Sequence, residues 1–308
     1  MDSSLIRAIL ATFGGFLLIL LFLSVHDWFL EEYPRRPEEQ TNSDLIQYPF
    51  HHQEAIETLR LFLQLPQSKK TVIQKKMIAN LMSMEQWISS LQQSNFQILC
   101  MGELHENSTR NFLSNEFFSN FSIDVLLLEA TPKELNRLMN RLEGGRDYFP
   151  LLGADIMSLL RTAVKRNPDV KIFGIEETYK QTENHHGQLN SRDQFIAQNF
   201  WDAFQTGSRH IILFGALHCT NEPAWLFHNL CNQTSHALKD KMINVLVVGE
   251  HQNGPVEAFV YFLDRIGIKM KHFVIPDTRS LPNLIYKCFP LLDHQILGKY
   301  RSLIIFRT

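Results

Sequence analysis

The sequence predicts a mainly parallel α/β sheet with helices on both faces. Short apolar runs rich in Val, Ile, Leu and Phe recur along the chain, and stretches with helical periodicity separate them. This alternation is typical of βαβ units, in which crossover helices join parallel strands. The 308 residues, of which 44% are hydrophobic, can bury a full core in one large domain behind an N-terminal preface.

The N-terminal segment differs from the rest because residues 8–25 carry no charge. As a helix, this segment would be roughly 27 Å long, close to the ~30 Å hydrocarbon core of a bilayer. Arg7 precedes it, and Trp28 and Tyr33 follow it as an aromatic belt would. The segment lacks both a lipoprotein cysteine and a convincing cleavage site. We therefore predict a transmembrane signal-anchor within residues 1–30, which makes a single-pass membrane protein with its folded domain outside the cytoplasm.

Residues 31–94 are predicted to form a linker and a helical hairpin. The first part, residues 31–44, is polar and contains two prolines, which is typical of a linker. Residues 52–64 and 69–92 then place apolar side chains at helical spacing, with Pro66 between them. We interpret these two helices as a hairpin that covers the core.

The first stretch with the features of an active site follows directly. Residues 96–101 have the length and composition of a buried strand, and the glycine after them permits a tight exit. Asn107 or Ser108 is suited to cap a following helix. Glu103 and His105 are therefore expected in a strand-to-helix loop. Ligands of open α/β sheets bind at such loops, at the carboxyl edge of the strands.

A second strand ends in the same pattern of glycine and histidine. Residues 210–214 form an apolar run that leads into Gly215 and then His218. Two strands that each end in Gly-x-x-His place two imidazoles at one edge of a parallel sheet. This repetition is the central observation in the sequence.

A third predicted strand, residues 124–129, ends in an acid. Thr131 and Glu134 form the pattern of a capping box, with a proline at the first helical position. The next helix therefore begins after Glu129, which leaves this carboxylate at the strand end in a position equivalent to that of Glu103.

The remaining chain supplies further elements of the same kind. We predict helices over residues 110–121, 155–166 and from 191 onward, strands over residues 170–175, 243–248 and 302–306, and a polar surface loop over residues 179–189.

Five residues are candidates for chemistry, and they are Glu103, His105, Glu129, Arg192 and His218. Two imidazoles with one or two carboxylates form a ligand set for a divalent metal that keeps an open position, where a bound water becomes a nucleophile near neutral pH. The same side chains can also act without a metal. A histidine then takes a proton from water, a glutamate orients that water, and an arginine neutralises the developing oxyanion.

Each candidate also has a purely structural explanation. His105 can hydrogen-bond to backbone, and the two glutamates can accept hydrogen bonds from the helix that follows each of them. Arg192 can pair with Asp193 or Glu183. Four weaker candidates are Glu176, Glu177, His185 and His186.

Several other classes of protein are not supported. The chain has no His-Glu-x-x-His, Gly-x-Gly-x-x-Gly, Walker or Gly-x-Ser-x-Gly motif. The net charge is −2 and no block of Lys and Arg is longer than two, which argues against nucleic-acid binding. The four cysteines form no Cys-x-x-Cys pair, and Cys100 falls in a predicted buried strand, where a thiol most often behaves as a small hydrophobe.

Four motifs together resemble the superfamily that includes erythromycin esterases, ChaN-type haem-binding lipoproteins, the Tiki and TraB proteins, and a domain of a Pasteurella toxin. The motifs are Gly-Glu-Leu-His (102–105), Leu-Leu-Leu-Glu-Ala (126–130), Ser-Arg-Asp-Gln-Phe-Ile-Ala-Gln-Asn (191–199) and Gly-Ala-Leu-His (215–218). The third is similar to the family's Arg-(Asp/Asn)-x-x-Met-Ala-x-x-(Ile/Val) helix, with Ile196 where methionine is usual. The match covers residues 96–250 and leaves the first 95 residues outside it.

The resemblance implies an α/β domain over residues 95–308, in which both Gly-x-x-His loops and the Glu129 strand end line one cleft. It also implies that the five candidate residues take the family's site positions. The esterase members imply ester hydrolysis by activated water, the Tiki members metal-dependent peptide cleavage, and the ChaN members haem binding and iron uptake. This chain lacks the lipoprotein cysteine and shows no counterpart to the ChaN tyrosines, and it is shorter than the macrolide esterases.

Our first hypothesis is a membrane-anchored hydrolase that cleaves an ester or amide bond in a small-molecule or peptide substrate. In one version, His105, His218 and either Glu103 or Glu129 hold a divalent metal such as Mn, Co or Zn. The alternative is a haem- or iron-binding uptake protein without turnover. A third hypothesis is an inert scaffold anchored to the membrane, in which the candidate side chains are buried in separate salt bridges.

Overall fold

The computed structural model describes residues 50–143, 154–185 and 189–307. The predicted transmembrane segment within residues 1–30 and the linker that follows it lie outside these ranges. In the described part of the chain, no helix combines the length and the apolar character that crossing a bilayer requires.

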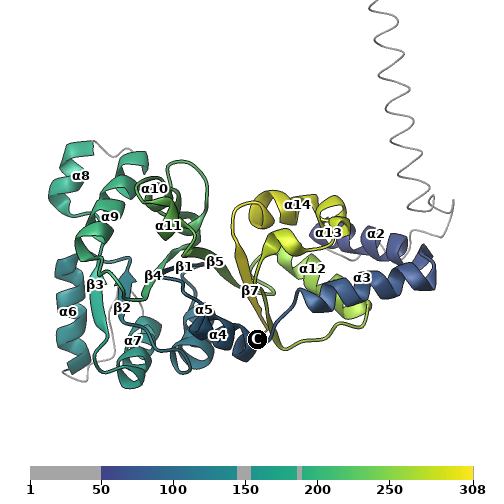
Figure 1. The fold of residues 1–308 in the computed structure, drawn as a ribbon, viewed down its shortest axis with the longest axis horizontal. Helices are drawn as coiled ribbons and strands as arrows, with labels where there is room; N and C mark the ends of the chain where they lie inside the picture. The colour runs from purple at the N-terminus through teal and green to yellow at the C-terminus, as the bar shows by residue number, and fades with distance from the viewer. Residues whose placement is uncertain (1–49, 144–153, 186–188, 308) are drawn as a thin grey trace, which may run out of the picture.

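Seven strands form one sheet in the order β3-β2-β4-β1-β5-β7-β6 (Figure 1). All neighbouring strands pair in parallel except β6, which is antiparallel to β7. The strands are β1 (Ile98–Glu103), β2 (Val125–Leu128), β3 (Lys171–Gly174), β4 (His210–Gly215), β5 (Met242–Gly249), β6 (His272–Ile275) and β7 (Ser302–Phe306). The predicted mainly parallel α/β sheet is confirmed, and β6 is the one strand that the sequence analysis missed.

Alternate residues of the central strands enter two separate cores, one on each face of the sheet. In β1, Ile98 and Cys100 belong to the first core, whereas Leu99 and Met101 belong to the second. Strands that are buried on both faces read as continuous apolar runs, as these do.

Helices cover both cores. The first core is covered by α2 (Phe50–Gln64), α3 (Gln67–Ala79), α9 (Leu189–Ala203), α10 (Leu226–Asn232), α12 (Gly254–Arg265), α13 (Asn283–Cys288) and α14 (Pro290–Leu292). The second is covered by α4 (Met84–Gln93), α5 (Asn107–Phe112), η2 (Leu113–Phe118), α6 (Pro132–Glu143) and α7 (Ala154–Arg166).

The helix predicted over residues 69–92 is two helices, α3 and α4. Between them, the backbone of Met82 pairs with Val274 of β6 through hydrogen bonds in both directions. Ser83 then starts α4 with a capping box that it shares with Gln86. The apolar periodicity continues through the break because Met82 packs against the second core.

Two further predictions were wrong in detail. The helix expected over residues 110–121 starts earlier, as α5, and continues as the π-helix η2. Its N-cap is Glu106, which makes no capping hydrogen bond through its side chain, so neither Asn107 nor Ser108 is the cap. The surface loop expected over residues 179–189 contains α8 (Tyr179–His185), which begins where Thr178 donates to Gln181 Oε1.

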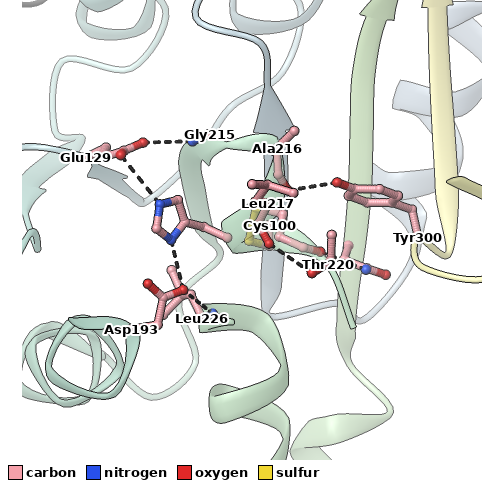
Figure 2. The surroundings of a disulfide bond; sticks show 12 residues. Cys100, Glu129, Asp193, Gly215, Ala216, Leu217, Thr220, Leu226 and Tyr300 are labelled. Atoms are coloured by element: carbon pink, nitrogen blue, oxygen red, sulfur yellow. Dashed lines mark hydrogen bonds and ion pairs between the residues drawn. A yellow bond between two sulfur atoms is a disulfide. The ribbon is translucent and has the colours of Figure 1, made fainter. Parts of the chain in front are cut away.

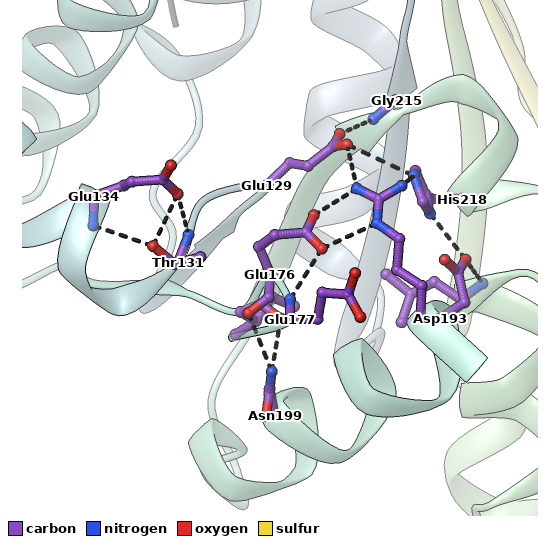
Figure 3. A network of polar contacts seen from close by, with 12 residues as sticks. Glu129, Thr131, Glu134, Glu176, Glu177, Asp193, Asn199, Gly215 and His218 are labelled. Carbon is purple, nitrogen blue, oxygen red and sulfur yellow. Dashed lines mark hydrogen bonds and ion pairs between the residues drawn. The ribbon is translucent and has the colours of Figure 1, made fainter. Parts of the chain in front are cut away.

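The capping box at the start of α6 is confirmed (Figure 3). The Thr131 hydroxyl accepts the Glu134 N–H at 3.2 Å, and the Glu134 carboxylate accepts the Thr131 N–H at 2.8 Å. Because the helix begins after these contacts, Glu129 stays at the end of β2, as the sequence predicts.

A disulfide joins Cys100 of β1 to Cys219 at the end of η3 (Ala216–Cys219), the short 3-10 helix after β4 (Figure 2). Cys100 is therefore a half-cystine, and not a small hydrophobic thiol. The segment after β4 lies close against β1, since a Cβ at Gly102 would be 2.9 Å from the Ala216 Cα. Both cysteines are fully buried, and disulfides of this kind are typical of proteins that fold in oxidising compartments.

Candidate active site

The structure brings all five predicted residues together at the carboxyl edge of the sheet. Glu103 is the last residue of β1, Glu129 follows β2, and His218 lies in η3 after β4. These three strands are neighbours, because β4 pairs with β1 on one side and with β2 on the other. The predicted proximity of the two imidazoles and the carboxylates is therefore found, which argues against separate, unconnected salt bridges.

The carboxylate of Glu129 is the centre of the arrangement (Figure 3). Its Oε2 accepts the Gly215 N–H at 2.8 Å and lies 3.4 Å from His105 Nε2. Its Oε1 accepts a hydrogen bond from Arg192 Nη2 at 3.1 Å and lies 3.6 Å from His218 Nε2. The Glu129 cluster is our name for the five residues of this paragraph, which are Glu129, Gly215, His105, Arg192 and His218.

Asp193 orients the ring of His218 (Figure 3). Asp193 Oδ2 lies 2.8 Å from His218 Nδ1 and accepts the Leu226 N–H at 2.6 Å. A carboxylate oxygen can only accept hydrogen bonds, so His218 Nδ1 is the proton donor. The lone pair of the neutral ring is then on Nε2, which accepts a hydrogen bond from Arg192 Nη1 at 3.1 Å.

His105 lies between two carboxylates. Nδ1 is 3.2 Å from Glu103 Oε1, and Nε2 faces Glu129. These hydrogen bonds raise the pKa of His105 to about 9, so the ring is charged at neutral pH. Arg110 Nη2 lies 3.1 Å from Nδ1 and opposes this charge, while its Nε donates to Glu103 at 2.8 Å.

The backbone places the His105 ring on the accessible side of the cluster. Its φ of 57° lies in the left-handed region, which few non-glycine residues adopt and which is often retained at functional sites. The ring also requires glycine opposite it, because a Cβ at Gly215 would be 2.7 Å from His105 Nε2. The side chain is 48% exposed, whereas that of His218 is 7% exposed.

Arg192 is held by two carboxylates. Glu176 binds the guanidinium at two points, with Nε to Oε1 at 3.0 Å and Nη2 to Oε2 at 2.6 Å. Burial would lower the pKa of Arg192, but its bonds to Glu176 and Glu129 raise it above the ordinary value. Among the described contacts, the guanidinium pairs with Glu176 and Glu129, and the alternative that it pairs with Asp193 is not found.

Glu129 is ionised across the whole physiological range. Burial would raise its pKa, but the hydrogen bond to His105, the positive charge that His218 carries when it is protonated, and the Gly215 N–H lower it to about 2. The carboxylate therefore accepts hydrogen bonds and holds cations, and it is not a proton donor.

We expect these two shifted pKa values to shape stability against pH. The raised pKa of His105 stabilises the fold fully below pH 6.5, and this contribution is lost as the pH rises through about 9. The lowered pKa of Glu129 stabilises the fold above pH 4.5, and this contribution is lost as the pH falls towards 2. Urea denaturation from pH 5 to 10 should show the alkaline decline, and His105→Asn should flatten it. An equal alkaline decline in both proteins would contradict the pairing.

Sequence reasoning missed Asp193, Arg110 and the Gly215 amide as parts of the site. Asp193 stands next to Arg192 in the helix, but adjacent helical residues point in different directions, so the neighbour of a candidate is a poor guess. Glu176 was only a weaker candidate, and its bidentate contact makes it a partner of the site. The weaker candidates His185 and His186 have no described side-chain placement.

A divalent metal does not fit the predicted ligand set as it is arranged. The described residues contain no group of three or more His, Cys, Asp or Glu placed to hold a metal ion. Glu103 faces His105 Nδ1, whereas Glu129 faces Nε2, so the two carboxylates lie on opposite sides of one ring. The Arg192 guanidinium donates to both His218 Nε2 and Glu129 Oε1, where a metal would need their lone pairs.

Comparisons with known proteins give only distant similarities. No family model and no curated protein sequence matches the chain. A solved structure from Bacillus cereus is similar with a TM-score of 0.44 and 10% identity, and the match covers 77% of this chain and 97% of that one. A structure described as bacterial protein toxins has a TM-score of 0.36 and 13% identity over 64% of this chain. RRSP, a MARTX toxin effector domain from Vibrio vulnificus, has a TM-score of 0.33 and 15% identity over 58% of this chain.

These similarities support no functional inference. The chain spans 45% and 42% of the lengths of the two toxin structures. The resemblance to the erythromycin esterase, ChaN and Tiki superfamily therefore stays a prediction. The fold and the site together define an α/β protein that has a cluster of acids, imidazoles and arginines at the carboxyl edge of its sheet.

Proposed function

We propose that this protein is a hydrolase that cleaves an ester or amide bond in a small-molecule or peptide substrate with an activated water, and that it does so without a metal ion. The observation that carries this proposal is the Asp193–His218 pair, which directs the basic nitrogen of His218 towards Glu129, beside the charged ring of His105. His218 is then the base, His105 the acid and Arg192 the cation that binds the oxyanion. All three side chains lie around the carboxylate of Glu129.

His218 is the general base in this proposal. Its Nε2 takes a proton from water while the water oxygen attacks the carbonyl carbon of the substrate, and the C=O π bond opens to an oxyanion. Asp193 keeps the proton of the neutral ring on Nδ1 and stabilises the imidazolium that forms. The contact of Arg192 Nη1 with Nε2 must open for the water to bind, after which Nη1 is free to bind the oxyanion.

His105 is the general acid. It is charged at neutral pH and half exposed, so it can reach a leaving group. When the tetrahedral intermediate collapses, the C–O or C–N bond breaks and the leaving atom takes a proton from His105. Transfer of the extra proton from His218 to His105 through solvent restores the starting state. Glu129 stays ionised throughout and orients the water and both cations.

The same contacts favour hydrolysis over a haem- or iron-binding role. A protonated imidazole has no lone pair for a metal, and the pKa of His105 is about 9. The second imidazole, that of His218, has both nitrogens engaged, by Asp193 and Arg192. Iron at His218 Nε2 would have to displace Arg192, as the proposed water also does, so it is the charged ring of His105 that favours hydrolysis.

A substrate screen before and after chelation tests the proposal. The full chain in dodecyl maltoside would be tested on p-nitrophenyl esters and fluorogenic peptide amides, as purified and after dialysis against EDTA. We expect turnover that chelation leaves unchanged. Stoichiometric bound metal with loss of turnover on chelation would reject the metal-free mechanism. Stoichiometric haem binding with a Soret shift, and no turnover on any substrate, would replace it with the uptake function.

A further inference from the structure

A basic pocket lies away from the Glu129 cluster, at the opposite edge of the sheet. Its volume is about 240 Å³, and Met242, the first residue of β5, and Arg301, directly before β7, both line it. The amino ends of parallel strands form this edge, whereas the carboxyl ends carry the candidate active site. Lys239, Arg279 and Lys299 also line the pocket, and no acidic side chain does.

We propose that this basic pocket binds a small anion that carries a phosphate group. Two of its four cations are neutralised locally, because Asp277 binds Arg279 at 2.9 and 2.7 Å and Glu222 lies 3.0 Å from Lys299. Neither Lys239 nor Arg301 has a carboxylate at ion-pair distance among the described residues. Four cations against two carboxylates leave a charge of about +2, which suits a phosphate dianion.

Buried hydrogen bonds fix the backbone of the basic wall of the pocket at Lys299 and Arg301. Asn244, which is 3% exposed, accepts the Arg301 N–H and donates to the Lys299 carbonyl, both at 2.8 Å. The same amide nitrogen donates to the Cys219 carbonyl at 2.8 Å, which ties this wall to the disulfide-linked segment. A backbone that is fixed before the ligand arrives need not be ordered on binding, which lowers part of the entropic cost.

The dimensions and lining indicate the ligand class. A volume of 240 Å³ lies below the roughly 300–1,000 Å³ of sites for drug-sized ligands, so the ligand is small. Arginine and lysine are the side chains that bind phosphate oxygens best. Phe227 and Met242 add an apolar side to the pocket, which suits the short organic group of a phosphomonoester.

Isothermal titration of the full chain in dodecyl maltoside tests this site without measuring any activity, so its result is independent of the proposed hydrolase. Inorganic phosphate and glycerol 3-phosphate would be compared at constant ionic strength. We expect saturable binding at one site. Tighter binding of glycerol 3-phosphate would support an organic phosphomonoester as ligand, and equal binding would support recognition of the phosphate group alone.

Charge-matched variants locate the binding. Arg301→Gln is expected to weaken phosphate binding roughly tenfold, since it removes a charge-assisted hydrogen bond. The double variant Lys239→Gln and Arg301→Gln should abolish it. Lys269→Gln makes the same charge change at an exposed position outside the pocket and should bind like the wild type. Absence of saturable binding by both ligands, or wild-type affinity in Arg301→Gln, would overturn the proposal.

Discussion

His218→Gln is expected to lower kcat/KM for the hydrolysed substrate by roughly 10²–10⁴-fold, the usual contribution of general base catalysis. Glutamine has no basic nitrogen, so no group at this position could take the proton from water. His218 is buried but belongs to neither apolar core, so the variant should remain folded. Circular dichroism and thermal melting would establish this before kinetics are compared.

Asp193→Asn separates orientation from basicity. Asparagine keeps the size of the side chain but can present its amide N–H to His218 Nδ1, which would favour the tautomer with the proton on Nε2. We expect a loss of the same order as for His218→Gln, together with an altered pH profile of kcat/KM.

The matched control for His218→Gln is His236→Gln, at an exposed position in the short helix α11 (His236–Lys239), and this control should behave like the wild type. Wild-type turnover in a folded His218→Gln protein would reject His218 as the base.

The central strands were predictable because each is buried on both faces. Strands β1, β4 and β5 read as continuous apolar runs in the sequence, and β7 has the bounds that were expected. Strand β6 is antiparallel to β7, so it falls outside the alternation of parallel strands and crossover helices on which the prediction was based. The break between α3 and α4 depends on pairing with this same strand, which local sequence could not reveal.

The site was predictable where it depends on strand ends. A parallel sheet brings the carboxyl ends of neighbouring strands together, so the two Gly-x-x-His segments and Glu129 could be expected to meet. The partners that arrive from helices could not be placed in this way. Arg110, Glu176 and Asp193 reach the site through the packing of α5, the β3–α8 connection and α9, which depends on tertiary contacts far apart in the sequence.

Glu129→Gln is expected to have the largest effect on stability of any single change in the site. The substitution keeps the shape of the side chain but removes the negative charge that His105 and Arg192 share. Arg192 then keeps only Glu176 and His105 keeps only Glu103, so each cation loses one charge-assisted contact, at a cost of roughly 1.5–3 kcal/mol in the free energy of unfolding. Urea denaturation at pH 7 measures this loss, and Glu85→Gln at an exposed position of α4 should cost almost nothing.

The same variant should also change the titration of His105. The pKa of this ring is raised first by Glu103 and second by Glu129, so in Glu129→Gln it should fall from about 9 but stay above the ordinary value of 6.5. The imidazole resonances of the variant, followed by NMR from pH 5 to 10, report this directly. An unchanged pKa together with a loss of stability would mean that Glu129 supports the fold through Arg192 alone. Glu103 would then keep the His105 ring charged by itself, and the contact with Glu129 would play no part in proton donation to the leaving group.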